Sequence, residues 1–189
     1  MKTKIFFDTE FTGLRQNTTL ISIGLVSETG KKFYGELTDY DESQVSNFVQ
    51  EHVISHLSLR ELAVGEETLV DYSNHPERVS VKGNSSAMAH ELSRWLLEFG
   101  EVQMWADHLA YDWVLFCELF GGARQLPDHI NYIPLDLPTA FEMKKIDPDI
   151  GREGFVGMGI DAKKHDALWD AEVLKACYEK LMNVGKGLS

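Results

Sequence analysis

The first third of the chain alternates between short apolar runs and turns. Apolar and β-branched residues dominate positions 5–7 and 18–26 and alternate with polar ones over 31–37, and Glu28-Thr29-Gly30 supplies a turn between the last two runs. Short apolar runs bounded by turn residues are typical of β-strands. The pattern therefore predicts an antiparallel meander of three strands.

From Asp41 the apolar residues follow a helical period, which predicts an amphipathic helix with Asp41 near its start. The apolar stripe runs through Val45, Phe48, Val49, His52 and Val53. Because His52 lies on this stripe, we expect a packed core histidine rather than a metal ligand. Residues 55–83 have no sustained period, and we expect them to form an irregular excursion at the surface.

Helical and strand patterns alternate in the second half of the chain. Helices are expected at about 85–99, 109–120, 138–145 and 166–184, and short strands at 102–106 and 130–135. Residues 147–159, with four glycines and a proline, are expected to form a loop. Three antiparallel strands followed by alternating helices and strands predict a mixed α/β sheet with helices on its faces.

Length and composition predict one globular domain over residues 1–184 and a flexible C-terminal tail over 185–189. Of the 189 residues 43% are hydrophobic, and no apolar segment reaches the roughly 18 residues that span a membrane. Cys117 and Cys177 are too isolated for a disulfide framework or a CxxC zinc site. Since the N-terminus also lacks a signal-peptide pattern, we expect a cytoplasmic protein.

The chain is acidic, with a formal net charge of −12 and no run of Lys or Arg. A protein that grips long duplex DNA through many phosphates normally carries a basic face. Extensive nonspecific DNA binding is therefore disfavoured, whereas a short or single-stranded nucleic acid held at one end by metal ions is compatible with this charge.

Two acids follow the first strand pattern at a spacing of two residues. Asp8 and Glu10 would project side by side, because alternate residues of a strand share a face. Two carboxylates at such a short distance repel each other, and a divalent ion such as Mg²⁺ between them would relieve the repulsion. Solvated turn acids are a common alternative, so a metal site needs further carboxylates.

Further acids occur at two places. Asp112 lies in a strongly apolar helix, where a carboxylate is costly unless it is paired, solvated or bound to metal; Asp107, at the end of the preceding strand, is its rival. The second place is residues 165–171, where His165 and Asp170 would diverge within one helix, since five residues rotate by about 140°. If Asp166 caps the helix, His165 lies in the preceding loop and can fold back over the first turn, which contains Asp170.

Together these motifs resemble those of the DEDD exonuclease superfamily. Residues 7–14 (FDTEFTGL) resemble the first motif, the aromatic–Asp pair at 111–112 resembles the second, and residues 165–170 match the H-x4-D form of the DEDDh branch. The chain is most similar to small bacterial and phage exoribonucleases related to RNase T and oligoribonuclease. The resemblance spans nearly the whole chain.

The resemblance implies an RNase H-like fold and 3′-to-5′ removal of nucleotides from single-stranded or short RNA. It also implies two Mg²⁺ ions, for which Mn²⁺ can substitute, and it is compatible with a homodimer. It favours Asp112 over Asp107, because the aromatic–Asp pair matches the motif. The implied metal ligands are Asp8, Glu10, Asp112 and Asp170, and His165 is the implied general base for the attacking water.

The residues expected to contact substrate are Thr9, Phe11, Leu14 and His108. Leu14 is the better candidate for a wedge against the terminal base, although Phe11 or Leu14 in a core role is an alternative. His108 stands where the second motif often carries asparagine. The remaining histidines, which we expect to be structural, are His56, His75, His90 and His129.

Two other functions fit the same motifs. A DNA exonuclease of the proofreading kind shares every catalytic residue, because recognition of the ribose 2′-hydroxyl depends on local contacts rather than on the acids. A silent module that only binds nucleic acid or protein would be expected to lose one or more of the acids, whereas this chain has all four and the histidine.

Overall fold

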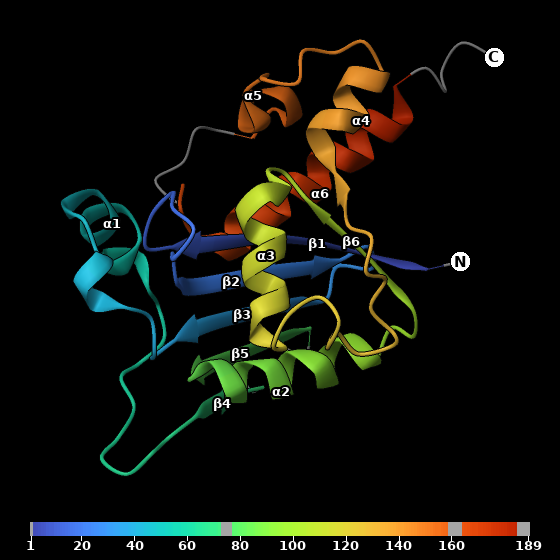
Figure 1. The fold of residues 1–189 in the computed structure, drawn as a ribbon. Helices are drawn as coiled ribbons and strands as arrows, with labels where there is room; N and C mark the ends of the chain where they lie inside the picture. Colours follow the sequence, from blue (N-terminus) through green and yellow to red (C-terminus); the bar gives the residue numbers. More distant parts are fainter. Residues whose placement is uncertain (1, 73–76, 159–163, 185–189) are drawn as a thin grey trace.

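The structure is a computed structural model that describes residues 2–72, 77–158 and 164–184 (Figure 1). A seven-stranded mixed sheet with the order β4-β5-β3-β2-β1-β6-β7 forms its centre. The strands are β1 Thr3–Phe11, β2 Leu20–Ser27, β3 Lys32–Leu37, β4 Leu69–Asp71, β5 Arg78–Gly83, β6 Val102–Ala106 and β7 Leu135–Asp136. Strands β1, β2 and β3 form the predicted antiparallel meander, and β6 and β7 continue from β1 in parallel. The predicted mixed α/β sheet is confirmed, and it is consistent with an RNase H-like fold.

Helices cover both faces of the sheet (Figure 1). They are α1 Asn47–His52, α2 Ser85–Leu97, α3 Leu109–Leu119, α4 Leu137–Met143, α5 Arg152–Val156 and α6 Ala167–Asn183. Alternate residues of β1 divide the core, because Ile5 and Phe7 pack with α2 and α3 whereas Phe6 packs with α4 and α6. The central strand is therefore buried on both faces, as its apolar run requires.

The predicted helix after Asp41 begins later than expected. Asp41 caps a short 3-10 turn, Glu42–Gln44, and α1 begins only after Ser46, whose side chain accepts from the backbone N–H of Val49. The core role expected for His52 is wrong, since His52 is exposed and its ring stacks on the exposed Phe48 at 4.3 Å between centroids. A helix of six residues has one narrow buried face, and Val49 occupies it.

The irregular excursion expected over 55–83 is also wrong at its C-terminal end. There β5 pairs in parallel with β3, and the short β4 pairs with β5 at the edge of the sheet. The sequence of β5 shows no clear apolar alternation, because the charged Lys82 occupies a buried position. Its ammonium group lies 3.4 Å from the carboxylate of the buried Glu36. A buried ion pair of this kind places charges at positions that a hydrophobic pattern assigns to solvent.

Two expectations after β6 need correction. The loop expected over 147–159 contains the short helix α5, and the strand expected over 130–135 is reduced to a bridge between Val102 and Ile130 followed by β7. The helices expected from Pro138 and from Asp166 are confirmed as α4 and α6. Residue His75 and the tail 185–189 lie outside the described residues. No helix in the described part of the chain combines the length and apolarity that crossing a membrane would need.

Candidate active site

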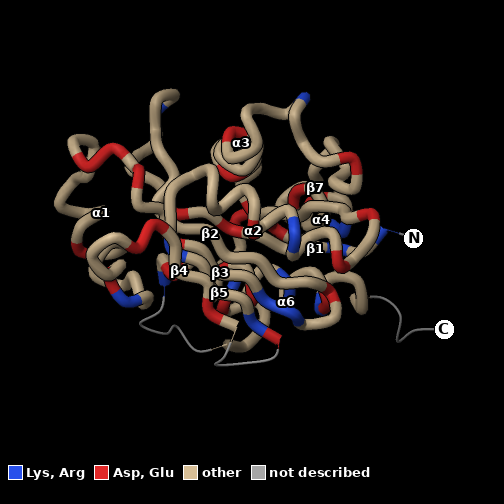
Figure 2. Tube along the Cα trace, turned by 90° about the horizontal axis from the view of Figure 1, so that it is seen from below, with Lys and Arg blue, Asp and Glu red and all other residues tan. Residues whose placement is uncertain are grey.

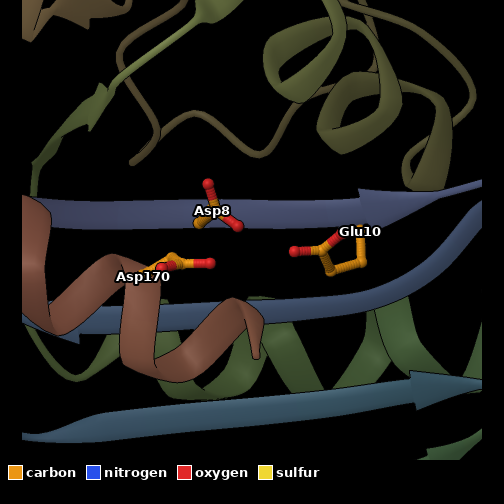
Figure 3. Close-up of side chains that lie close together, drawn as sticks. All are labelled: Asp8, Glu10 and Asp170. Atoms are coloured by element: carbon orange, nitrogen blue, oxygen red, sulfur yellow. The ribbon is translucent and has the colours of Figure 1, made fainter. Parts of the chain in front are cut away.

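Three carboxylates meet where the end of β1 lies beside the first turn of α6. Asp8 and Glu10 come from β1 and Asp170 from α6, and one carboxylate oxygen of each lies within 4.8 Å of the others (Figure 3). The side-by-side arrangement expected of Asp8 and Glu10 is thus found. Asp170 lies beside them although it is more than 150 positions away in the sequence. Hard divalent cations prefer such oxygen ligands.

The start of α6 orients Asp170 and His165. Asp166 is the N-cap of the helix, and its side chain accepts from the backbone N–H groups of Leu168 and Trp169. His165 precedes the helix in the left-handed conformation, at φ 71°, and its backbone N–H donates to Asp170 Oδ2 at 3.1 Å. Its ring Nδ1 lies 3.8 Å from Glu10 Oε1. The predicted cap is confirmed, and the loop conformation brings His165 back over the acids.

Asp112 approaches β1 from the opposite face. It lies in the first turn of α3 and is only 5% exposed, and its carboxylate accepts a hydrogen bond from the hydroxyl of Thr9. Thr9 faces α3 because strand residues alternate, so Asp8 and Glu10 on either side of it face away. Asp112 lies outside the three-acid group, but its negative charge contributes to raising the pKa of both Asp8 and Glu10.

Asp107 has a different partner. The guanidinium group of Arg152, on α5, donates to both of its carboxylate oxygens at 2.8–3.0 Å. Arg152 also lies over the ring of Phe141, at 4.9 Å from the ring centroid. This ion pair neutralises Asp107 and ties α5 to the end of β6. Sequence reasoning missed Arg152 because it placed residues 147–159 in a loop, and no local pattern links Arg152 with Asp107.

The acids of the site are held in unfavourable electrostatic surroundings. Burial is the main cause that raises the pKa of Asp8 well above its usual value, that of Glu10 to about 8 and that of Asp170 to about 7. Burial also raises the pKa of Asp112 to about 6, against the opposing hydrogen bond from Thr9. Within the described residues, no Lys or Arg forms an ion pair with any of these four acids. Like charges that are partly or fully buried and have no cationic side chain beside them fit a divalent ion, which would neutralise them.

The pKa of His165, in contrast to those of the four acids, is lowered. Burial is the main cause that lowers the pKa of His165 below 6.5, and the neighbouring Lys164, His52 and His56 act in the same direction. The ring of Phe48 lies edge-on to the His165 ring at 5.5 Å, so α1 forms a wall beside it. A histidine that is neutral at pH 7 can accept a proton.

These groups line one open cleft of about 930 Å³. Its walls come from the end of β1, residues 11–15, α1, the start of α3, residues 149–153 and His165. All the residues expected to contact substrate line it: Thr9, Phe11, Leu14 and His108. Leu14 is 78% exposed, which rules out a core role for it, while the half-buried Phe11 stacks on Tyr111 at 5.3 Å between ring centroids.

Besides Arg152, which is paired with Asp107, two cationic side chains line the cleft and were not singled out from the sequence. They are Arg15, in the loop after β1, and Lys164, beside His165. Elsewhere in the described part of the chain, Lys and Arg are interspersed with Asp and Glu and form no continuous basic band (Figure 2). A polyanion would therefore meet cationic side chains locally at the cleft rather than along an extended track.

Comparison with known proteins gives one family and two relatives. The profile of the 3′-5′ exoribonuclease Rv2179c-like domain matches residues 3–182, which include every residue of the site described above. The relatives are the 3′-5′ exoribonuclease Rv2179c of Mycobacterium tuberculosis strain H37Rv and the 3′-5′ exoribonuclease MT2234.1 of strain CDC 1551. Each is 26% identical over 141 residues, which cover 74% of this chain and 74% of the relative.

Proposed function

The chain belongs to the 3′-5′ exoribonuclease Rv2179c-like domain family, and from this premise we propose that it removes nucleotides from the 3′ end of single-stranded or short RNA. The observation that carries the proposal is the group formed by Asp8, Glu10 and Asp170, whose ligand oxygens lie within 4.8 Å of one another. Three half-buried acids with raised pKa values and no cationic partner among the described residues suit metal-dependent hydrolysis of a phosphodiester better than nucleic-acid binding alone.

We propose that Asp8, Glu10 and Asp170, together with Asp112, would hold two Mg²⁺ ions, with Mn²⁺ as a substitute. Such ions, when bound, supply charge stabilisation for the attacking and leaving oxygens and lower the pKa of the attacking water. The hydroxyl of Thr9 keeps Asp112 oriented, and the backbone N–H of His165 does the same for Asp170. The chain's own contribution is therefore a rigid set of oxygen donors supported by hydrogen bonds from outside the set.

His165 is the proposed general base, which makes the site one of the DEDDh type. Its backbone is fixed by the hydrogen bond to Asp170, while its ring lies on the cleft side near Glu10. The lowered pKa keeps the ring neutral at pH 7 and therefore able to take the proton of the attacking water. The ring of Phe48 lies edge-on beside that of His165.

The cleft offers contacts for a strand end rather than for a long duplex. Leu14 presents an exposed apolar side chain, and the stacked pair Phe11–Tyr111 lies beside it in the same lining. Apolar and aromatic surfaces of this kind support unpaired bases without strong sequence preference. Arg15 and Lys164 would meet the adjacent phosphates, and His108 the terminal nucleotide.

Matched RNA and DNA strands labelled at the 5′ end test the proposed function. With Mg²⁺, the RNA should shorten stepwise as its 3′ end recedes, and a 3′-terminal phosphate should slow the reaction by crowding the end of the cleft. Gel electrophoresis of early time points separates the outcomes. Internal fragments at the earliest times would indicate an endonuclease, and faster degradation of the DNA would favour the proofreading-type alternative.

Comparison of Asp112→Asn with Asp107→Asn tests the choice of the second acid. Loss of a group that only supports a metal ligand lowers metal affinity or activity by about 10–100-fold. Asp112 is itself a proposed ligand, so Asp112→Asn should lower turnover by about 10²-fold or more. Asp107→Asn should have a much smaller effect, because Asp107 is paired with Arg152. Circular dichroism should show both variants folded, and thermal unfolding of Asp107→Asn reports the loss of that ion pair. The reverse ranking of turnover would show that Asp107 is the functional acid.

A further inference from the structure

Gly24 lies opposite Asp8 in the sheet. The two residues are direct partners in the antiparallel register of β1 and β2, and α6 packs on both strands at this point. No side chain therefore stands between the backbone of β2 and the helix that carries Asp170.

The missing side chain of Gly24 leaves space that the helix backbone fills. A Cβ atom at Gly24 would lie 2.3 Å from the carbonyl carbon and oxygen of Ala167 and from the backbone N of Leu168. The helix is thin on this side, since Ala167 and Ala171 are fully buried one turn apart. The strand and the helix therefore meet here almost backbone to backbone, with no large side chain between them. Gly24 has no left-handed φ, so the requirement for glycine here is one of space and not of conformation.

We propose that Gly24 is a positioning residue of the active site: it sets how closely the first turn of α6 approaches the sheet, and thereby where Asp170 stands relative to Asp8 and Glu10. The inference deepens the proposed function and rests on it for the role of the acids. The contact itself involves the residues next to the site on both sides, because Gly24 faces Asp8 across the strands and Ala167 precedes Asp170 by three positions.

The effect on the site depends on how far a side chain at position 24 would push α6 away from the sheet. An alanine at position 24 would have to separate the strand and the helix by about an ångström before its contact reached an ordinary 3.4 Å. The three atoms that the Cβ would meet belong to the backbone of α6, so no side-chain rotation can relieve the overlap. Metal sites require ligand distances within about 0.2 Å, and a misplacement of about 1 Å at a reacting centre can cost about 10²-fold in rate.

Gly35 provides a matched control. It lies on the neighbouring strand β3, opposite Ile23, and a Cβ atom there would point to the other face of the sheet. That Cβ would lie 2.4 Å from the sulfur of Met88 on α2, an overlap as tight as that at Gly24. The obstacle is the end of a flexible side chain on the face of the sheet opposite α6, so Gly35→Ala reports the effect of a buried Gly→Ala change without moving α6.

The experiment compares Gly24→Ala with Gly35→Ala by calorimetric titration with Mn²⁺, without RNA, and by steady-state kinetics. Gly24→Ala should bind Mn²⁺ at least about 10-fold more weakly and should turn over about 10²-fold more slowly, with KM for RNA nearly unchanged. Higher Mn²⁺ concentrations should restore part of its rate. Gly35→Ala should resemble the wild type in both measurements. Equal Mn²⁺ affinities in the two variants and the wild type would overturn the inference.

A second variant covers the case in which Gly24→Ala does not fold. Ala171→Val adds bulk to the same face of α6, against Val26 and Tyr34, and leaves the sheet unchanged. Overpacking of this size is usually tolerated by the fold, and it should weaken Mn²⁺ binding in the same direction. Unchanged binding would count against a role for helix depth. Because the titration needs no RNA, a wild type that binds Mn²⁺ but leaves RNA intact would refute the proposed function without touching this inference.

Discussion

Removal of divalent ions is expected to lower the exonuclease activity at least about 10³-fold, and Asp8→Asn is expected to do nearly the same in excess Mg²⁺. Metal ions contribute several kcal/mol to such reactions, and each 1.36 kcal/mol is about tenfold in rate. Asp8 is the central acid of the group, since the charges of Asp112, Asp170 and Glu10 all raise its pKa. Loss of its charge should therefore remove the ions as well as one ligand.

Assays with EDTA, followed by addition of Mg²⁺ or Mn²⁺, measure this dependence. Activity should return with either ion. Asp149→Asn is a suitable control, because Asp149 is exposed and lines the same cleft without belonging to the group of acids. Full activity in EDTA, or an Asp8→Asn variant as active as Asp149→Asn, would contradict the metal-dependent mechanism.

Removal of the ions should also show in the stability of the protein. The raised pKa values mean that the folded, metal-free state binds more protons than the unfolded state, whose carboxylates titrate near pH 4. This contribution to stability is fully present below about pH 4 and is lost as the pH rises through the folded values of about 7 and about 8. Stabilisation by Mg²⁺ in urea unfolding should therefore be larger at pH 8 than at pH 5.5, and Asp170→Asn should reduce the difference.

The fold could be predicted where local patterns and burial agree. The meander of β1, β2 and β3 follows from three apolar runs, and α6 follows from its apolar period together with the capping Asp166. Strand β5 could not be predicted in the same way, because the buried Lys82 depends on Glu36, a residue 46 positions earlier. Pairing of buried charges is a tertiary property, and a local window does not contain the partner.

The site, like the fold, could be predicted from local patterns only in part. Strand alternation placed Asp8 and Glu10 together, and the cap at Asp166 placed His165 in the loop before the helix, as the structure has them. The partner of Asp107 and the contact beneath α6 were out of reach, since Arg152 and Gly24 acquire their roles only through packing. A glycine inside a strand pattern signals close approach of some other group, but it does not say which helix approaches.

Replacement of His165 by alanine is the second large effect, with an expected loss of about 10²–10⁴-fold in turnover, the usual contribution of a general base. His165 lies outside the carboxylate group and contacts Asp170 through its backbone N–H, which alanine retains. Mn²⁺ affinity should therefore remain close to that of the wild type. This combination distinguishes a proton acceptor from a metal ligand, whose loss would lower both quantities.

The pH profile gives the sharper test of His165. As a base the ring must be neutral, and its pKa lies below 6.5, so the wild-type rate should rise with pH through the acid range and level off near neutrality. His165→Ala should lack this limb when measured with the same ion, because a metal-bound water can also produce a rising limb. His52→Ala, which removes an exposed ring 6.1 Å from that of His165, should retain the limb and most of the turnover. If His165→Ala keeps both the wild-type turnover and the wild-type profile, His165 is not the base, and the bound ions alone must activate the water.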